Sequence, residues 1–371
     1  MKKIGIITYH RAYNYGSALQ AYALNKYIRS LGYDAQTIDY RTEGQDRIYS
    51  FYEKNRSVMS VARNIQSFLY HKRDIQKYKR FDEFVENDIV LSKTKNYRKD
   101  NIELCNNIYD GFVCGSDQIW NSNCSDFTDD YLLGFVKDKS KCFSYAPSIG
   151  TEKISDDTKK LFIKNNVKKF SSLSVREKSA AKLINGTIGI IPEVVIDPTL
   201  LLDREEWNKL IDSRKYKDKY ILCYYIGNVS GMREYARNLS KKTGLPLVMI
   251  IRNIRDTVYF NRKAYESGPK EFLSLIKNAE YICTNSFHAI IFSIVFNKKF
   301  WVFTEKNNTI KPQKRIFDFT EMTGLSDRVL NVDNCGSVSG LEDIDFEKVD
   351  NKLKPYIEKS KQYLEDALNK I

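Results

Sequence analysis

The chain has 371 residues, of which 42% are hydrophobic and 13% aromatic, which suffices for buried cores and about two domains. This composition excludes wholesale disorder, and the presence of only 7 Pro and 17 Gly excludes collagen-like and proline-rich classes. The net charge of +13 favours an anionic partner, such as nucleic acid, an anionic membrane surface or an acidic small molecule, without choosing among them.

Cysteine and histidine usage narrows the class of protein further. The seven cysteines show no CxxC spacing and several lie in apolar runs, which is typical of buried thiols in a reducing compartment. Only three histidines are present, which argues against a zinc site. The apolar run after Met1-Lys2-Lys3 is too short for a signal peptide, and no run approaches the ~20 residues of a membrane span. We therefore expect a cytoplasmic protein, at most peripheral at the inner face of a membrane.

The first 40 residues predict a strand, a glycine turn, a helix and a second strand. The strand covers 3–8, the turn is Asn14-Tyr15-Gly16-Ser17, the helix covers 18–31 and the next strand covers 35–39. This βαβ unit implies a parallel sheet with right-handed crossovers. The same series continues up to the break at Asp197-Pro198, with strands at 110–114, 141–145, 172–175 and 194–196 and helices at 157–170 and 177–184.

Residues 41–99 interrupt this rhythm, because they are rich in Lys, Arg and Tyr and poor in glycine. Within them, 58–86 reads as a basic helix. We interpret this stretch as an excursion from the sheet, whose helices either cover a sheet edge or form a surface for anions.

A second alternating series begins near Asp203. It predicts strands at 220–226, 247–251, 281–284 and 300–303 and helices at 205–211, 232–242, 269–278 and 287–296. A charged amphipathic helix at 346–368 ends the chain. Two consecutive series predict two Rossmann-like α/β domains, 1–202 and 203–345, that face each other across a cleft.

Open parallel sheets bind ligands beyond the carboxyl ends of their strands, so polar residues that follow strands are the candidates for a site. The turn with Asn14 and Gly16 opens a helix, where backbone N–H groups can hold an anion or a sugar, although a purely structural turn fits equally well. The loop with Ser116, Asp117 and Trp120 suits a sugar, since tryptophan stacks on sugar rings and carboxylates fix hydroxyls. Its alternative is an Asp-initiated turn packed by the tryptophan.

Two further candidates each follow a later strand. Arg176 ends a strand where a helix begins, and its guanidinium can clamp a phosphate or carboxylate, or else pair with Glu177. His288 follows Thr284-Asn285-Ser286-Phe287 at the start of an apolar helix, a position that favours function over a core role. His10 follows the first strand and is a weaker candidate. Motifs for dinucleotides, P-loops, zinc proteases and serine hydrolases are absent from the sequence.

In this order the motifs resemble those of the polysaccharide pyruvyl transferase family. The similarity covers nearly the whole chain except 41–99, and each motif is loose while their joint order is specific. The residues that carry it are Gly5 to Thr8 with Asn14 to Leu24, Val113 to Asn121, Tyr145 to Gly150, Ser174 to Glu177, Asp197 to Thr199 and Thr284 to Ala289.

The resemblance implies a fold like that of the GT-B glycosyltransferases, with the final helix, 346–371, crossing back to the first domain. It implies phosphoenolpyruvate as donor and a sugar of a cell-surface polysaccharide or its lipid-linked precursor as acceptor. The product would be a pyruvate ketal, with no metal or cofactor required. Many members read Ser-Arg-Leu-His where this chain reads Asn285-Ser286-Phe287-His288, so Ser286 replaces an arginine. Lys311, Lys314 and Arg315 follow in the same domain and can supply the missing cation.

This chemistry assigns roles to the candidates. Phosphoenolpyruvate is small and highly anionic, so Arg176 is expected to hold it, together with Ser286, Lys314 and Arg315. His288 is expected to move protons, with Asp117 as partner base or acceptor-positioning group. Four residues are expected to contact the acceptor, namely Asn14, Gly16, Ser116 and Trp120.

Two other functions compete with this one. The first is a GT-B glycosyltransferase with a nucleotide-sugar donor, in which Lys314 and Arg315 would hold the diphosphate, but no carboxylate for the ribose stands out. The second is a nucleic-acid or membrane-surface protein acting through 41–99, where tyrosines interleave with Lys and Arg. Acidic residues such as Asp46, Glu53 and Asp74 interrupt that charge. We therefore expect no nucleic-acid partner, and only weak binding to anionic membranes.

Overall fold

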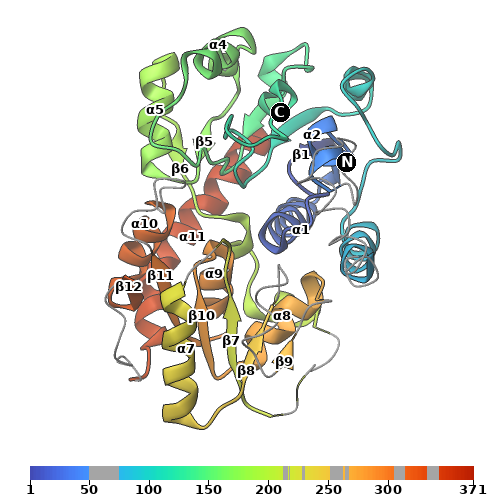
Figure 1. The fold of residues 1–371 in the computed structure, drawn as a ribbon. Helices are drawn as coiled ribbons and strands as arrows, with labels where there is room; N and C mark the ends of the chain where they lie inside the picture. The colour runs from blue at the N-terminus through green and yellow to red at the C-terminus, as the bar shows by residue number, and fades with distance from the viewer. Residues whose placement is uncertain are drawn as a thin grey trace, which may run out of the picture. The chain divides into compact units, whose positions relative to one another are not determined.

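The computed structural model of the chain describes residues 1–49, 75–211, 216, 218–227, 230–250, 262–263, 267–304, 314–331 and 342–371. The described chain separates into two compact units (Figure 1). Unit 1 contains Met1–Leu201 and Glu358–Ile371, and unit 2 contains Leu202–Ile357. Lys311 and residues 50–74 of the predicted excursion lie outside the described residues.

Unit 1 is built on a parallel four-stranded sheet. Its strands are β1 (Lys3–Ile7), β2 (Asp34–Thr37), β3 (Gly111–Cys114) and β4 (Cys142–Ser144), in the spatial order β2-β1-β3-β4. Ile4 pairs with Ala35 on one side and with Gly111 on the other. A small parallel sheet of β5 (Ser174–Val175) and β6 (Glu193–Val194) follows. Residues of β1, β3 and β4 are almost all buried, as expected for a parallel sheet covered on both faces.

Apart from α2, which was not predicted, the helices of unit 1 follow the predicted order, with shifted ends. They are α1 (Tyr15–Ser30), α2 (Glu43–Ile48), a helix at 75–88, α4 (Asp156–Lys164) and α5 (Lys178–Ile188). Short 3₁₀ turns lie at Ile102–Asn107, Asp129–Leu132, Lys139–Lys141, Val167–Lys169 and Pro198–Leu200. The first helix starts three residues earlier than predicted, because Asn14 caps it.

Unit 2 is built on a parallel six-stranded sheet with the order β12-β11-β10-β7-β8-β9. The strands are β7 (Ile221–Tyr224), β8 (Leu247–Met249), β9 (Arg262–Lys263), β10 (Tyr281–Thr284), β11 (Lys299–Thr304) and β12 (Val329–Asn331). The helical elements are α6 (Arg204–Asn208), α7 (Ser230–Thr243), α8 (Pro269–Asn278), α9 (Phe287–Val295), α10 (Lys314–Thr323) and a 3₁₀ turn at Ser326–Arg328. Eight of the nine residues of α9 are buried, so this helix is part of the core.

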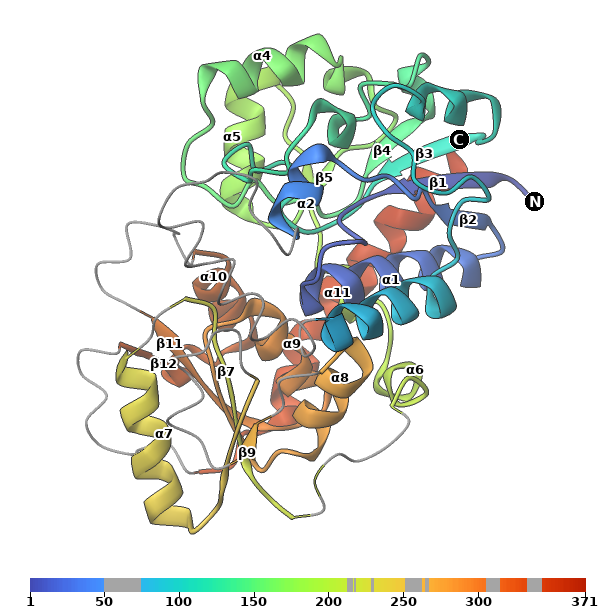
Figure 2. The same cartoon turned by 45° about the vertical axis from the view of Figure 1, so that its right-hand side comes forward.

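The last helix, α11 (Phe346–Asn369), begins in unit 2 and ends in unit 1. In unit 1 the Ser360 hydroxyl accepts the backbone N–H of Ile196 at 3.0 Å, and the Tyr363 hydroxyl donates to the backbone oxygen of Ser144 at 2.8 Å. Figure 2 shows this helix (red) entering unit 1 close to β4. The prediction of α/β architecture with parallel sheets and a final helix that crosses back is confirmed.

Candidate functional site

The sheet of unit 1 reverses its winding between β1 and β3. The chain passes from β1 to β2 on one side and then crosses to β3 on the other. Ligands of open α/β sheets bind at the carboxyl ends of the strands beside such a reversal. There the Thr8 hydroxyl donates to the Ser116 backbone oxygen at 3.1 Å, so the segments after β1 and β3 are joined at this edge.

Backbone strain marks the same edge. Asp117 and Ala146, which follow β3 and β4, have φ values of 68° and 53° although neither is glycine. Ser148 donates its backbone N–H to the Asp117 oxygen at 2.8 Å, which ties the two segments together. The fully buried Ser148 hydroxyl has no hydrogen-bond partner among the described residues. Strain of ~1–3 kcal/mol per residue and a buried unpaired hydroxyl are both typical of functional sites.

The Asp117 carboxylate is held by the first turn of α1. Its Oδ2 accepts the Ser17 hydroxyl at 2.5 Å, and both side chains are buried. Asn14 caps this turn, since its Oδ1 accepts the N–H of Gly16 at 2.9 Å and that of Ser17 at 3.5 Å. The Asn14 side chain therefore already uses the amides that we expected to hold a ligand, although Asn14 itself is exposed.

Arg176 lies in a buried ion-pair cluster. Its Nη1 donates to Asp197 Oδ2 at 2.7 Å and its Nε donates to Glu177 Oε1 at 3.0 Å. Ser116 joins the cluster, because its hydroxyl donates to the same Asp197 oxygen at 3.4 Å. Burial lowers the pKa of the guanidinium, but Glu177, Asp197 and Asp117 raise it by more, so the group stays charged. Two carboxylates already balance this cation, which favours a positioning role over the expected clamp on a trianionic donor.

Trp120 belongs to the core of unit 1. The side chain is fully buried, its Nε1 donates to the Tyr131 backbone oxygen at 3.1 Å, and Phe162 packs edge-on at 5.2 Å. The expected stacking of a sugar on Trp120 does not fit this position, because both faces of the ring meet protein.

His10 is engaged on both ring nitrogens. Its Nδ1 lies 3.1 Å from the Thr8 oxygen and its Nε2 lies 3.2 Å from Asp39 Oδ1. Arg11 also pairs with Asp39, at 2.6 Å. Burial raises the pKa of Asp39, but its bonds to His10 and Arg11 outweigh burial and hold it well below its usual range. We interpret this cluster as structural.

A second carboxyl near Asp117 is missed by the sequence analysis. Asp126 is buried and accepts the Tyr9 hydroxyl at 3.2 Å. Burial raises the pKa of Asp126, and the charge of Asp117 raises it further despite the bond from Tyr9. A signal for it existed in the long polar stretch 116–126 after β3. Two neighbouring carboxyls in unlike environments are a common arrangement for acid–base chemistry.

The sheet of unit 2 has the same kind of reversal between β7 and β10. Asn285 directly follows β10, and its side-chain amide joins this segment to the one after β7. Its Oδ1 accepts the Ile226 N–H at 2.7 Å, and its Nδ2 donates to the Ile226 backbone oxygen at 2.8 Å. Ser286 is the N-cap residue of α9, yet its side chain makes no capping hydrogen bond. The first turn of α9 thus begins at the switch point without a side-chain cap, a setting that suits an anion.

His288 and Arg315 each lie against the ring of Phe287, which is in this first turn. The His288 ring lies 5.4 Å from the Phe287 ring, nearly perpendicular to it, and the side chain is 6% exposed. The Arg315 guanidinium, from the first turn of α10, lies 5.5 Å from the same ring. The Arg315 guanidinium thus lies against the residue that follows Ser286 in the chain. Lys314 is exposed.

Arg233 is a further cation that the sequence analysis misses. It lies in the first turn of α7, directly after β7, and its Nη2 donates to the Tyr225 hydroxyl at 2.8 Å. Tyr225 follows β7 and is buried. Cations thus flank the switch point on the α7 side as well as the α10 side.

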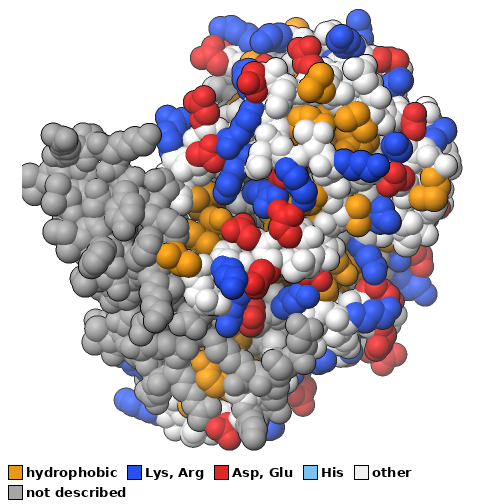
Figure 3. Space-filling model, turned by 90° about the vertical axis from the view of Figure 1, so that its right-hand side faces the viewer, with side chains coloured by type: hydrophobic (Ala, Val, Ile, Leu, Met, Phe, Trp, Pro, Cys, Tyr) orange, Lys and Arg blue, Asp and Glu red, His pale blue; other side chains and the backbone are white. Residues whose placement is uncertain are grey.

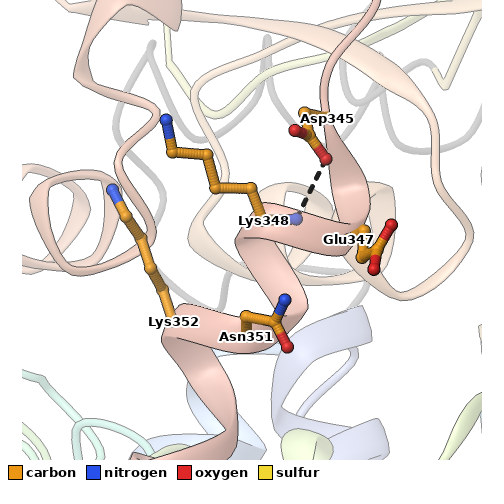
Figure 4. A pocket seen from close by; sticks show the side chains of 5 residues that line it. All are labelled: Asp345, Glu347, Lys348, Asn351 and Lys352. Atoms are coloured by element: carbon orange, nitrogen blue, oxygen red, sulfur yellow. Dashed lines mark hydrogen bonds between the residues drawn. The ribbon is translucent and has the colours of Figure 1, made fainter.

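One pocket of about 370 Å³ lies elsewhere on unit 2, at the start of α11 (Figure 4). Its lining includes Asp345, Lys348 and Lys352, and the Lys348 N–H donates to Asp345 at 3.0 Å. Asp343 pairs at 2.7 Å with Lys299, the first residue of β11. The pocket therefore lies near the amino ends of the strands, away from the edge where such sheets bind ligands.

The described residues contain no group of three His, Cys, Asp or Glu side chains arranged for a metal ion. Over the same part of the chain, no helix has the length and apolar character to cross a bilayer.

Similar solved structures share low sequence identity with the chain. The Staphylococcus aureus MnaA–UDP co-structure is 13% identical, with 98% of this chain and 90% of that chain covered and a TM-score of 0.48. A putative UDP-N-acetylglucosamine 2-epimerase from Listeria monocytogenes is 10% identical, with 97% and 90% covered and a TM-score of 0.49. The Escherichia coli heptosyltransferase WaaC with ADP is 10% identical, with 96% and 99% covered and a TM-score of 0.40. These similarities support no conclusion about the reaction.

No curated protein matches the sequence. The sequence does match a protein family over residues 14–307, a range that includes the candidate motifs from Asn14 to Ala289 but not Gly5 to Thr8, His10 or the start of α10. The description of the matched family model is polysaccharide pyruvyl transferase. The chain therefore belongs to the polysaccharide pyruvyl transferase family.

Proposed function

We propose that this protein transfers the pyruvyl group of phosphoenolpyruvate to two hydroxyls of a saccharide, forming a cyclic ketal and releasing phosphate. Family membership supports pyruvyl transfer to a polysaccharide in general. The observation that carries the donor assignment is the first turn of α9, where the His288 ring and the Arg315 guanidinium each lie against Phe287. An anionic enol phosphate requires a cation that binds it and a group that can transfer a proton to it.

The donor anion is assigned to the first turn of α9. Phosphoenolpyruvate carries about three negative charges, and the turn offers backbone N–H groups that no Ser286 side chain caps. Arg315 supplies the guanidinium, with Arg233 as a second cation on the other side of the reversal. Arg176 is assigned a positioning role instead, because Asp197 and Glu177 already pair with it.

His288 is proposed to deliver the proton that the enol carbon needs. In the first step an acceptor hydroxyl attacks C2 of the donor, while C3 gains a proton and becomes a methyl group. In the second step the C2–O bond to phosphate breaks and the other hydroxyl closes the ring. The acceptor hydroxyls lose two protons in total. One of them compensates for the proton added to C3, and the other leaves with the phosphate. Acid–base help of this kind is worth ~10²–10⁴ in rate.

Asp117 is proposed to accept a proton from the acceptor hydroxyl. Its carboxylate is fixed by Ser17 at 2.5 Å and its backbone is strained, so its position is closely defined. We propose that the acceptor belongs to a cell-surface polysaccharide or its lipid-linked precursor, and that the protein works in the cytoplasm at the inner face of the membrane.

The experiment is a donor and acceptor screen with the purified protein. Phosphoenolpyruvate and a set of nucleotide sugars are each offered with a panel of saccharides, and phosphate release, nucleotide release and the mass of the acceptor are followed. We expect phosphate release only with phosphoenolpyruvate and an acceptor, together with a mass gain of one ketal. Nucleotide release with transfer of a sugar would establish the glycosyltransferase alternative.

A further inference from the structure

An aromatic seam joins α1 to the helix at 75–88, and Figures 1 and 2 both show the two helices side by side. Along most of its length the seam is ordinary core. Tyr15 packs on Phe81 with ring centroids 5.1 Å apart, and Tyr22 packs on Phe84 at 5.8 Å. Both phenylalanines are at least 98% buried. This part of the seam fixes the helix on unit 1.

The end of the seam near the start of α1 has a different character. Three tyrosines from three segments meet there, Tyr13 before α1, Tyr49 after α2 and Tyr78 in the helix at 75–88. Tyr13 stacks on Tyr78 with centroids 3.9 Å apart and planes 9° from parallel, while Tyr49 packs edge-on against Tyr13 at 4.9 Å. We call these three residues the tyrosine cluster. All three residues are partly exposed, so the tyrosine cluster reaches the surface of unit 1.

The tyrosine cluster lies beside the candidate site of unit 1. Tyr13 directly precedes the cap residue Asn14, and four residues later Ser17 binds the Asp117 carboxylate. The cluster therefore extends the carboxyl edge of the sheet, where we place the reacting sugar.

The polar surroundings of the cluster indicate the chemistry of its ligand. The Tyr13 hydroxyl donates to both oxygens of Asp82, at 3.2 and 3.3 Å, and Arg41 also interacts with it, so a carboxylate and a guanidinium border the rings. The helix at 75–88 carries three basic residues against four acidic ones. The basic residues are Lys77, Lys79 and Arg80, and the acidic ones are Asp82, Glu83, Glu86 and Asp88. Figure 3 shows basic and acidic side chains interspersed over the visible face. This mixture disfavours an anionic lipid or nucleic acid and suits a neutral polyol.

We propose that the tyrosine cluster is a saccharide subsite, which binds a neutral sugar unit of the acceptor next to the unit that reacts. Aromatic faces bind the apolar C–H faces of sugar rings, and bordering carboxylates accept sugar hydroxyls. The subsite rests on the proposed function, in that it extends the acceptor assigned to Asp117. It replaces Trp120, whose ring is buried, as the aromatic contact of the acceptor.

The test compares Tyr78→Ala with Tyr78→Phe and with Tyr22→Ala. Tyr22→Ala is the matched control, because it removes a tyrosine from the same seam, away from the tyrosine cluster. Binding to a printed array of neutral hexose and N-acetylhexosamine oligosaccharides is measured without donor, and acceptor KM and donor KM are measured where turnover occurs. For Tyr78→Ala we expect glycan binding to weaken and acceptor KM to rise by about tenfold, with donor KM unchanged. Tyr78→Phe should retain most binding, and Tyr22→Ala should bind like the unaltered protein.

The outcomes separate this proposal from the proposed function. Glycan binding that depends on Tyr78, without any turnover of phosphoenolpyruvate, supports the subsite and contradicts the proposed reaction. Turnover with an acceptor KM that Tyr78→Ala leaves unchanged overturns the subsite and leaves the reaction. Absence of glycan binding by the unaltered protein also overturns the subsite. Binding to phosphatidylglycerol vesicles that Tyr78→Ala abolishes, with glycan binding intact, would make the cluster a membrane contact instead.

Discussion

Replacing Arg176 should lower stability more than it lowers donor binding. The side chain is 3% exposed and pairs with Asp197 at 2.7 Å and Glu177 at 3.0 Å, whose side chains are 1% and 8% exposed. Arg176→Ala leaves these two buried carboxylates without their cation. Breaking a buried pair in this way costs about 3–5 kcal/mol. That is a large part of the ~5–15 kcal/mol by which a typical domain is stable, and it corresponds to a fall in unfolding temperature of roughly 10 °C.

Calorimetry and urea unfolding followed by circular dichroism measure this loss. Lys160→Ala is the control, because Lys160 pairs with Asp157 on the surface of the same unit and both side chains are largely exposed. We expect no measurable change for that variant. The reasoning is refuted if Arg176→Ala unfolds like the unaltered protein while its donor KM rises steeply. Arg176 would then be a direct donor ligand, as the sequence alone suggested.

Four further outcomes follow from the geometry. His288→Gln should lower phosphate release from phosphoenolpyruvate by roughly 10²-fold or more in kcat, with a smaller change in donor KM. Arg315→Ala should raise donor KM by about tenfold, whereas Lys314→Ala, at an exposed neighbour, should change it far less; steady-state kinetics compare the two. Asp117→Asn should lower kcat without changing donor KM, and equal loss of donor affinity would contradict the acceptor assignment. Because the pKa of Asp39 is depressed in the folded protein, its stabilisation holds above about pH 4 and fades on acidification below it, so the stability gap between the unaltered protein and Asp39→Asn should narrow there in urea titrations.

Local sequence signals predicted the regular elements well. The limits of α8 and β10 agree with the prediction. Pro269 marks the start of the helix, and a short turn separates the end of the helix from the strand. Short elements such as α2 and β12 were missed, since six and three residues carry too little periodicity to stand out. The early start of α1 depends on one cap, Asn14.

The roles of site residues depended on contacts that no local pattern contains. Arg176 was expected to bind an anion, but its partner Asp197 lies 21 residues further along the chain. Trp120 looked like a ligand residue in a polar loop, yet the loop folds so that its ring packs on Phe162. Asp126 gains its raised pKa from burial, and its bond to Tyr9 spans 117 residues. The sequence shows which polar residues follow the strands. Which of their side chains are already hydrogen-bonded or ion-paired within the protein depends on tertiary packing.

The most direct test of the proposed reaction follows the donor carbons through it. Phosphoenolpyruvate labelled with ¹³C at C2 and C3 is incubated with the protein and an acceptor saccharide in D₂O, and the products are observed by NMR. The account predicts one ketal per phosphate released, with the label at the ketal carbon and a methyl group that carries one deuterium. His288→Gln should slow the appearance of both signals together. Phosphate release with free labelled pyruvate and no ketal, despite a complete acceptor panel, would contradict the assignment of this chain as a ketal-forming transferase.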